Sequence, residues 1–107
     1  MKPSEVLRGG IEQIKRRGWH QGGLWRDDPC TGPVCMAGAL YAAADGASCA
    51  DGVNVNLYSD DVLEASLVVE KVTAWNIAWW NDAPGRTRRQ VLHATGRAAR
   101  MLEAEGR

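Results

Sequence analysis

Four side chains in the 107-residue sequence carry the soft or borderline ligands that zinc prefers. They are His20, Cys30, Cys35 and Cys49, enough for a tetrahedral shell. Structural zinc sites bring their ligands as closely spaced pairs, whereas four residues separate Cys30 from Cys35 and Cys49 lies beyond a predicted helix. We therefore expect no cofactor, with zinc as the alternative. In the favoured interpretation Cys35 is a small buried residue and the other two thiols bind no metal.

Cys35 is also a candidate catalytic nucleophile, because it follows a proline-led helix start at which the helix dipole lowers the pKa of a thiol. His93 or His20 would act as the base, and Asn81 or Asp82 would complete the set. His93, however, is predicted to share a helix face with three arginines and to point toward solvent. A cysteine- or metal-dependent enzyme is therefore the alternative function, and not the favoured one.

The stretch from Trp79 to Thr87 is the most distinctive part of the sequence. Its Asn and Asp side chains are of the kind that bond nearby backbone amides, and its Pro-Gly pair favours a tight turn. Thr87 begins a T-x-x-Q capping box at the start of a helix. The favoured interpretation is architectural, with Trp80 in the core and with Asn81 and Asp82 bonding amides and pairing with Arg86.

A binding site is the alternative interpretation of the same stretch. In that case its polar groups face a pocket together with the Gly-rich segment around His20. The candidate binding residues are polar or aromatic: Trp19, Gln21, Trp79, Asn81, Asp82 and Arg86.

The net charge of zero hides a segregation of charge along the chain. Residues 1–26 carry six basic and two acidic side chains, residues 27–82 one basic and nine acidic, and residues 83–107 six basic and two acidic. If the two ends pack side by side, they form a basic face that attracts an acidic or nucleic-acid partner. Otherwise the opposite segments attract each other within the fold. No nucleic-acid-binding motif is present, but the last predicted helix and the turn before it carry a basic set of Arg86, Arg88, Arg89, Arg97 and Arg100.

Apolar residues at helical spacing predict most of the secondary structure. The segment 33–45 has no charge before its last residue and is rich in Ala and Gly, as is typical of a buried central helix. At most a minor two-stranded piece is expected, from residues 22–26 and 53–57. We expect a mainly α, compact single domain of about four helices that spans residues 1–107. The predicted helices cover 5–17, 33–45, 60–73 and 88–105, with a short helical turn over 75–80 and N-caps at Ser4, Ser59, Asn76 and Thr87.

No run of eighteen apolar residues is present, and the first residues lack the apolar region of a signal peptide. We therefore expect a cytoplasmic protein with no membrane partner. The odd number of cysteines, three, favours reduced thiols over a disulfide framework.

Three motifs give the chain a family resemblance. They are Gly18-Trp19-His20-Gln21-Gly22, the segment Cys35–Leu40, and the segment Trp80–Thr87. Together they resemble the pattern GWxQG, CxxGAL and WNDxPGRT of a family of small uncharacterised proteins of actinobacteria and their bacteriophages. The resemblance covers about residues 5–100 and implies a shared fold, not a reaction. We expect a binding protein that acts on another protein, such as a host factor, and a weak nucleic-acid binder is a further alternative.

Overall fold

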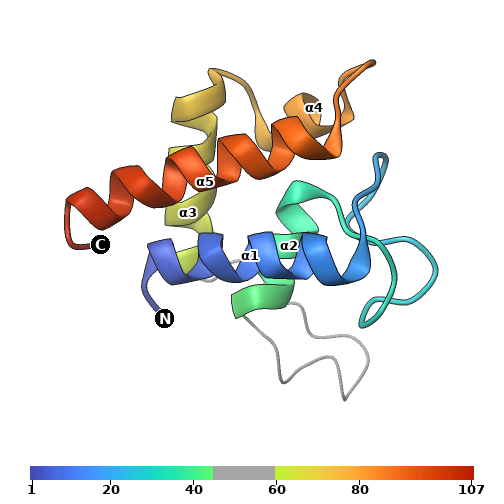
Figure 1. Cartoon of the computed structure of the whole chain (residues 1–107), viewed down its shortest axis with the longest axis horizontal. Coiled ribbons are helices and arrows are strands. Elements are labelled where there is room, and N and C mark those ends of the chain that lie inside the picture. The colour runs from blue at the N-terminus through green and yellow to red at the C-terminus, as the bar shows by residue number, and fades with distance from the viewer. Residues whose placement is uncertain (45–59) are drawn as a thin grey trace.

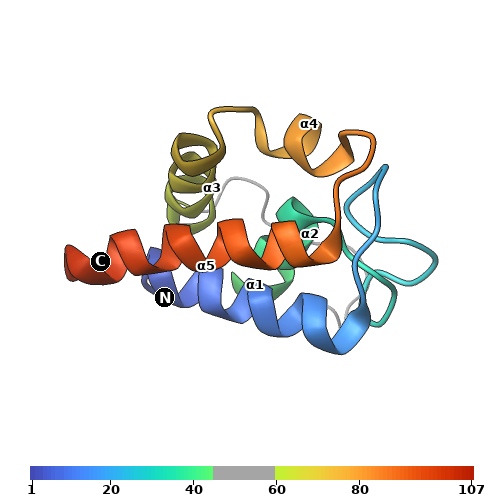
Figure 2. The ribbon, with the colours of Figure 1, turned by 45° about the horizontal axis from the view of Figure 1, so that its top comes forward.

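Helices α1 (Pro3–Arg17) and α5 (Arg88–Ala104) lie side by side and run in opposite directions, so both ends of the chain lie at one end of the molecule (Figure 1 and Figure 2). The computed structural model describes residues 1–44 and 60–107. Because α1 and α5 lie side by side, the two basic ends of the chain pack together, and Arg8 pairs with Glu103 across them (Nη2–Oε1 2.8 Å). The described residues form α1 (Pro3–Arg17), α2 (Met36–Ala44), α3 (Asp60–Thr73), α4 (Ile77–Asp82) and α5 (Arg88–Ala104).

Helix α1 begins earlier than predicted, at Pro3. Proline suits the first position of a helix, where its missing N–H has no partner to lose. The Glu5 side chain also accepts a hydrogen bond from the Lys2 amide (2.9 Å). Ser4, the predicted N-cap, is instead buried inside the first turn. Gly18 ends the helix as predicted, with a φ of 95° that favours glycine.

Gly9 and Gly10, which would weaken an isolated helix, allow α1 to approach α2 closely. A Cβ added at Gly9 would lie 2.8 Å from the Cβ of Ala43, and one added at Gly10 would lie 2.8 Å from Cδ2 of Leu40. Small residues on α1 and α2 therefore let the two helices pack closely against each other.

Helix α2 is shorter than the predicted helix 33–45, because the residues before Met36 are extended. Val34 forms one isolated β-bridge with Trp19 and another with Trp25. These bridges hold Val34 in an extended conformation, whereas the sequence pattern placed this residue in the first turn of the helix. The proline before Val34 therefore precedes the helix instead of starting it.

The predicted β element is reduced to these bridges within residues 1–44 and 60–107. Residues 22–26 contribute one bridge, through Trp25, whereas residues 53–57 and the predicted cap Ser59 lie outside the described residues. The mainly α fold is confirmed. The described residues contain five helices where about four were expected, because the predicted turn over 75–80 is the separate helix α4.

The predicted caps of the last two helices are confirmed. The Oδ1 of Asn76 accepts hydrogen bonds from the amides of Ala78 (3.0 Å) and Trp79 (3.3 Å) at the start of α4. Thr87 and Gln90 exchange the two side-chain-to-backbone bonds of a capping box (3.2 and 3.0 Å) at the start of α5. The first residue of each of these two helices is thus fixed locally by its cap.

The core is aliphatic and lies between α1, α2, α3 and α5. On α5 the predicted apolar face is buried, whereas Arg89, His93, Arg97 and Arg100 are exposed. None of the helices in the described residues is both long enough and apolar enough to cross a bilayer. The fully buried aliphatic side chains include Val6, Leu7 and Ile14 of α1, Met36 and Leu40 of α2, Val69 of α3, and Val91, Ala98 and Ala99 of α5.

Replacing Gly38→Ala should destabilise the protein by about 2 kcal/mol, because the added Cβ would overlap the Leu24 carbonyl oxygen and the backbone cannot yield cheaply. Gly96→Ala is the matched control, since its Cβ would lie 3.6 Å from Arg100 Nη1 and alanine favours the helix by up to about 1 kcal/mol. Urea unfolding of the two variants measures the difference. Equal stability of the two variants would contradict the close approach at Gly38.

Candidate binding surface

Asn81, in the last turn of α4, is fully buried and its side chain makes four hydrogen bonds. Its Oδ1 accepts from the Trp19 indole Nε1–H (2.7 Å) and from the Met36 amide (2.9 Å) at the start of α2. Its Nδ2 donates to the His20 carbonyl (3.2 Å) and to Oδ1 of Asp82 (2.9 Å). One side-chain amide therefore joins the segment after α1 to the start of α2 and to α4.

The neighbouring polar groups strengthen the same connection. Gln21 Nε2 donates to the carbonyls of Asn81 (3.0 Å) and Ala83 (2.9 Å), and the Gly22 amide donates to Oδ1 of Asp82 (3.0 Å). The structure thus brings Gln21, Asn81 and Asp82 of the predicted binding set together. Their hydrogen-bonding groups, however, are directed at one another and at the backbone. This arrangement agrees with the architectural interpretation of the stretch.

Arg86 does not pair with Asp82, so that part of the architectural prediction is wrong. Arg86 Nε donates to the Trp80 carbonyl (2.9 Å), and the guanidinium lies 3.9 Å from the centroid of the Trp80 ring. This is a cation–π contact. The Asp82 carboxylate instead accepts from the Gly22 amide and from Asn81.

An apolar pocket of about 480 Å³ opens beside α4. Trp75 is 59% exposed and Trp79 is 72% exposed, so the pocket presents two indoles to solvent. Trp79 was a predicted binding residue, and the structure adds Trp75 beside it. The pocket is lined by Trp75, Trp79, Trp80, Asp82, Ala83, Pro84 and Arg86.

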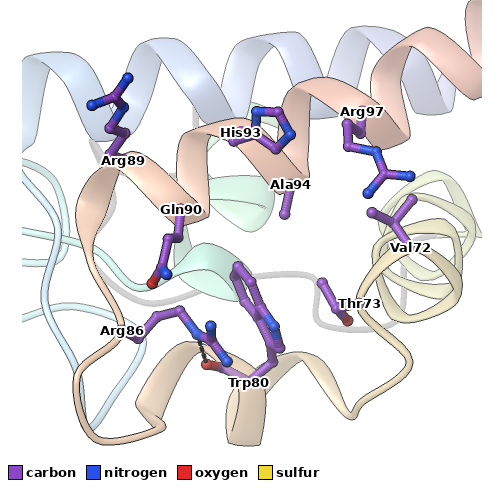
Figure 3. Close-up of a pocket in the computed structure, with 9 residues that line it drawn as sticks. All are labelled: Val72, Thr73, Trp80, Arg86, Arg89, Gln90, His93, Ala94 and Arg97. Carbon is purple, nitrogen blue, oxygen red and sulfur yellow. Dashed lines mark hydrogen bonds between the residues drawn. The ribbon is translucent and has the colours of Figure 1, made fainter.

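A second, basic pocket of about 440 Å³ lies between α5, the end of α3 and α4 (Figure 3). The Trp80 ring stands inside it, with Arg86 on one side and Thr73 on the other. The Arg97 side chain reaches down from α5 toward Val72, while Arg89 turns outward. The pocket is lined by Val72, Thr73, Trp80, Arg86, Arg89, Gln90, His93, Ala94 and Arg97.

The arginines of the basic pocket have no acidic partner in the described parts of the chain. The ion pairs among the described residues join Arg8 to Glu103, Arg107 to two glutamates, and the N-terminal amine to Asp61. No carboxylate lines the basic pocket. Positive charge therefore faces solvent over the first half of α5.

A comparison with protein families identifies the lineage of the chain. The pattern of DUF6197, a family of unknown function, matches residues 1–101. The chain belongs to this family. No curated protein and no solved structure matches the chain. Membership in a family of unknown function, expected from the sequence motifs, is confirmed, and the three motif segments of this DUF6197 chain meet at Asn81.

The candidate nucleophile Cys35 is buried in this DUF6197 protein, and its Sγ accepts a hydrogen bond from the Gly38 amide (3.3 Å). Burial is the main cause that raises the pKa of the Cys35 thiol, opposite to the predicted effect of a helix start. His93 lies exposed on the basic pocket, whose lining does not include Cys35. The structure thus does not bring Cys35 and His93 to one pocket.

His20 and Cys30, the other candidate zinc ligands in the described residues, belong to no cluster of side chains that could hold a metal ion. His20 is half-buried, its Nδ1 lies 3.0 Å from the Gln21 carbonyl, and its buried Nε2 has no hydrogen-bond partner among the residues that the structure describes. Cys30 lies half-buried in the loop before α2, and Cys49 is outside the described residues. Within residues 1–44 and 60–107, no three His, Cys, Asp or Glu side chains gather as a metal site would require.

Some residues of the two pockets were not in the predicted binding set. Trp75 lies four residues before Trp79. Ala74, between α3 and α4, has a positive φ of 64°, which no sequence pattern predicted. Gln90 and Thr73 enter the basic pocket because their helices converge there. The arginines of α5 were predicted as a basic surface, but not as the wall of a pocket.

Replacing Asn81→Ala should cost about 3 kcal/mol, because it leaves the Trp19 indole N–H and the Met36 amide without their acceptor. Asp82→Asn is the matched control, since asparagine keeps an oxygen for the Gly22 amide at an exposed position, and it should change stability by less than about 0.5 kcal/mol. Thermal and urea unfolding compare them. A stable Asn81→Ala variant would show that this amide does not hold the fold.

Cys35 should resist iodoacetamide in the folded protein and react only after unfolding, because its thiol is buried and its raised pKa keeps the thiolate scarce. Mass spectrometry of digested samples, labelled with and without urea, reports the modification of this cysteine. Labelling of native Cys35 as fast as a small-molecule thiol would contradict this assignment.

Proposed function

We propose that this protein is a binding module that recognises another protein through its two exposed tryptophans. The observation that carries the proposal is the exposure of Trp75 and Trp79 side by side at the apolar pocket. Tryptophan dominates protein-binding hot spots because it removes a large apolar area from water upon binding. The sequence resemblance supports a host protein in the bacterial cytoplasm as the partner.

The exposed indoles stand on an ordered base, which lowers the entropy cost of binding. Asn76 caps α4 just before Trp79, and Glu70 of α3 accepts a hydrogen bond from the Ile77 amide (2.9 Å). At its other end α4 is fastened by Asn81. The Trp79 indole is therefore presented by a helix that is bonded at both ends, and Trp75 lies in the connection directly before the cap of that helix.

Binding of single-stranded nucleic acid is the second candidate, supported by exposed indoles next to arginines that have no acidic partner in the described part of the chain. Bases stack on indoles, and guanidinium groups bind phosphates. Asp82 argues for the protein partner, because its exposed carboxylate lies on the apolar pocket and would repel a phosphate chain that crosses it.

The double variant Trp75→Ala/Trp79→Ala should keep its fold and lose protein binding by about 30-fold or more, the effect of a lost hot spot. The partner is first identified by co-purification from cells in which the protein occurs naturally, and its affinity for each variant is then measured with both components pure.

Leu63→Ala/Leu67→Ala provides the matched control, because both leucines are as exposed as Trp75 but line neither pocket. This control should bind within about twofold of the unchanged protein. Loss of binding in the leucine variant with retention in the tryptophan variant would move the binding face to α3. The absence of any protein that binds the unchanged chain saturably would refute the proposal.

A further inference from the structure

We propose that the partner presents an acidic segment with an apolar anchor, and that its carboxylates bind the arginines of the basic pocket while the anchor contacts the indoles. This inference rests on the proposed function and names the chemistry of the partner. It is carried by the position of the two pockets, by their charges and by the spacing of the arginines on α5.

The two pockets form one continuous surface, because both are lined by Trp80 and Arg86. The Arg86 guanidinium lies over the Trp80 ring at their boundary. We call the joined pockets the Trp-Arg surface. Its apolar end is at Trp75 and Trp79, and its basic end is along α5.

The basic end offers nitrogen-bearing side chains at regular intervals. Arg89, His93 and Arg97 follow each other at four-residue spacing on α5, which separates them by about 6 Å along the helix axis. Alternate side chains of an extended strand are about 6.6 to 7 Å apart, and side chains four residues apart on a partner helix are about 6 Å apart. Carboxylates on either kind of acidic segment therefore match this row.

Side chains recognise the anion in this arrangement. At the start of α5 the amides of Thr87 and Gln90 are already bonded within the capping box. The planar guanidinium fork is suited to carboxylates, and Arg89 and Arg97 have no acidic partner among residues 1–44 and 60–107 that would occupy their forks.

The distribution of charge favours a peptide over a nucleic acid. Within the described residues no carboxylate lines the basic end, whereas the apolar end carries the exposed carboxylate of Asp82. A nucleic acid has phosphates along its whole length and meets repulsion at Asp82. A protein segment places negative charge at one end and an apolar residue at the other, which complements both ends of the Trp-Arg surface.

The probe is a short fluorescein-labelled peptide in which two leucines are followed by glutamates at alternate positions, separated by serines. A peptide with glutamine in place of every glutamate is its control, and oligo(dT) represents nucleic acid. Fluorescence anisotropy at low salt should show that the glutamate peptide binds about tenfold more tightly than the glutamine peptide. The difference should shrink as salt is added.

Arg89→Gln/Arg97→Gln should weaken binding of the glutamate peptide by about tenfold and leave the glutamine peptide unaffected. Arg88→Gln/Arg100→Gln is the matched control, because it removes the same charge from exposed positions of α5 that line neither pocket. It should change affinity by less than about threefold. Equal effects of the two double variants would mean that net charge alone attracts the peptide, and this result would overturn the inference.

Three further outcomes would also overturn it: tighter binding of oligo(dT) than of the glutamate peptide, no saturable binding of that peptide, or self-association that Arg89→Gln/Arg97→Gln abolishes in sedimentation. The last would make a second copy of the chain the occupant. If the partner found by co-purification depends on Trp75 and Trp79 but tolerates Arg89→Gln/Arg97→Gln, the inference fails while the proposed function stands.

Discussion

The buried side-chain amide of Asn81 is the interaction on which the rest of the structure depends. It accepts two hydrogen bonds and donates two, and three of these bonds reach segments 45 to 62 residues away in the sequence. A buried amide is tolerated only when its polar atoms find partners, so the partners must sit where this side chain requires. The start of α2, the indole of Trp19 and the end of α4 are therefore held to one geometry.

This arrangement divides the tryptophans by their environment. Trp19 is half-buried and bonded to Asn81, and Trp80 packs against the core beneath Arg86. Trp75 and Trp79 have no such partner in the described residues and stand in solvent beside an apolar pocket. The same short helix thus has one face that fixes the fold and another that is available to a partner, which is the physical basis of the proposed binding function.

The sequence predicted the elements set by local chemistry and missed those set by distant contacts. The cap of α4 and the capping box of α5 followed from the side chains of Asn76 and Thr87, and apolar spacing gave the buried face of each long helix. The late start of α2 did not follow, because it arises from bridges between Val34 and indoles on another segment. Likewise, no local pattern shows that Asp82 bonds Gly22 while Arg86 stacks on Trp80, or that the arginines of α5 border a pocket.

Hydrogen exchange of the indole N–H groups, followed by NMR in the unbound protein, tests the central claim most directly. The claim is that one buried amide fixes Trp19 while Trp75 and Trp79 remain exposed for a partner. It predicts slow exchange at the Trp19 indole, on the scale of global unfolding, and fast exchange at the other two. Exchange at Trp19 as fast as at Trp75, or protection of Trp75 and Trp79 in the unbound state, would contradict it.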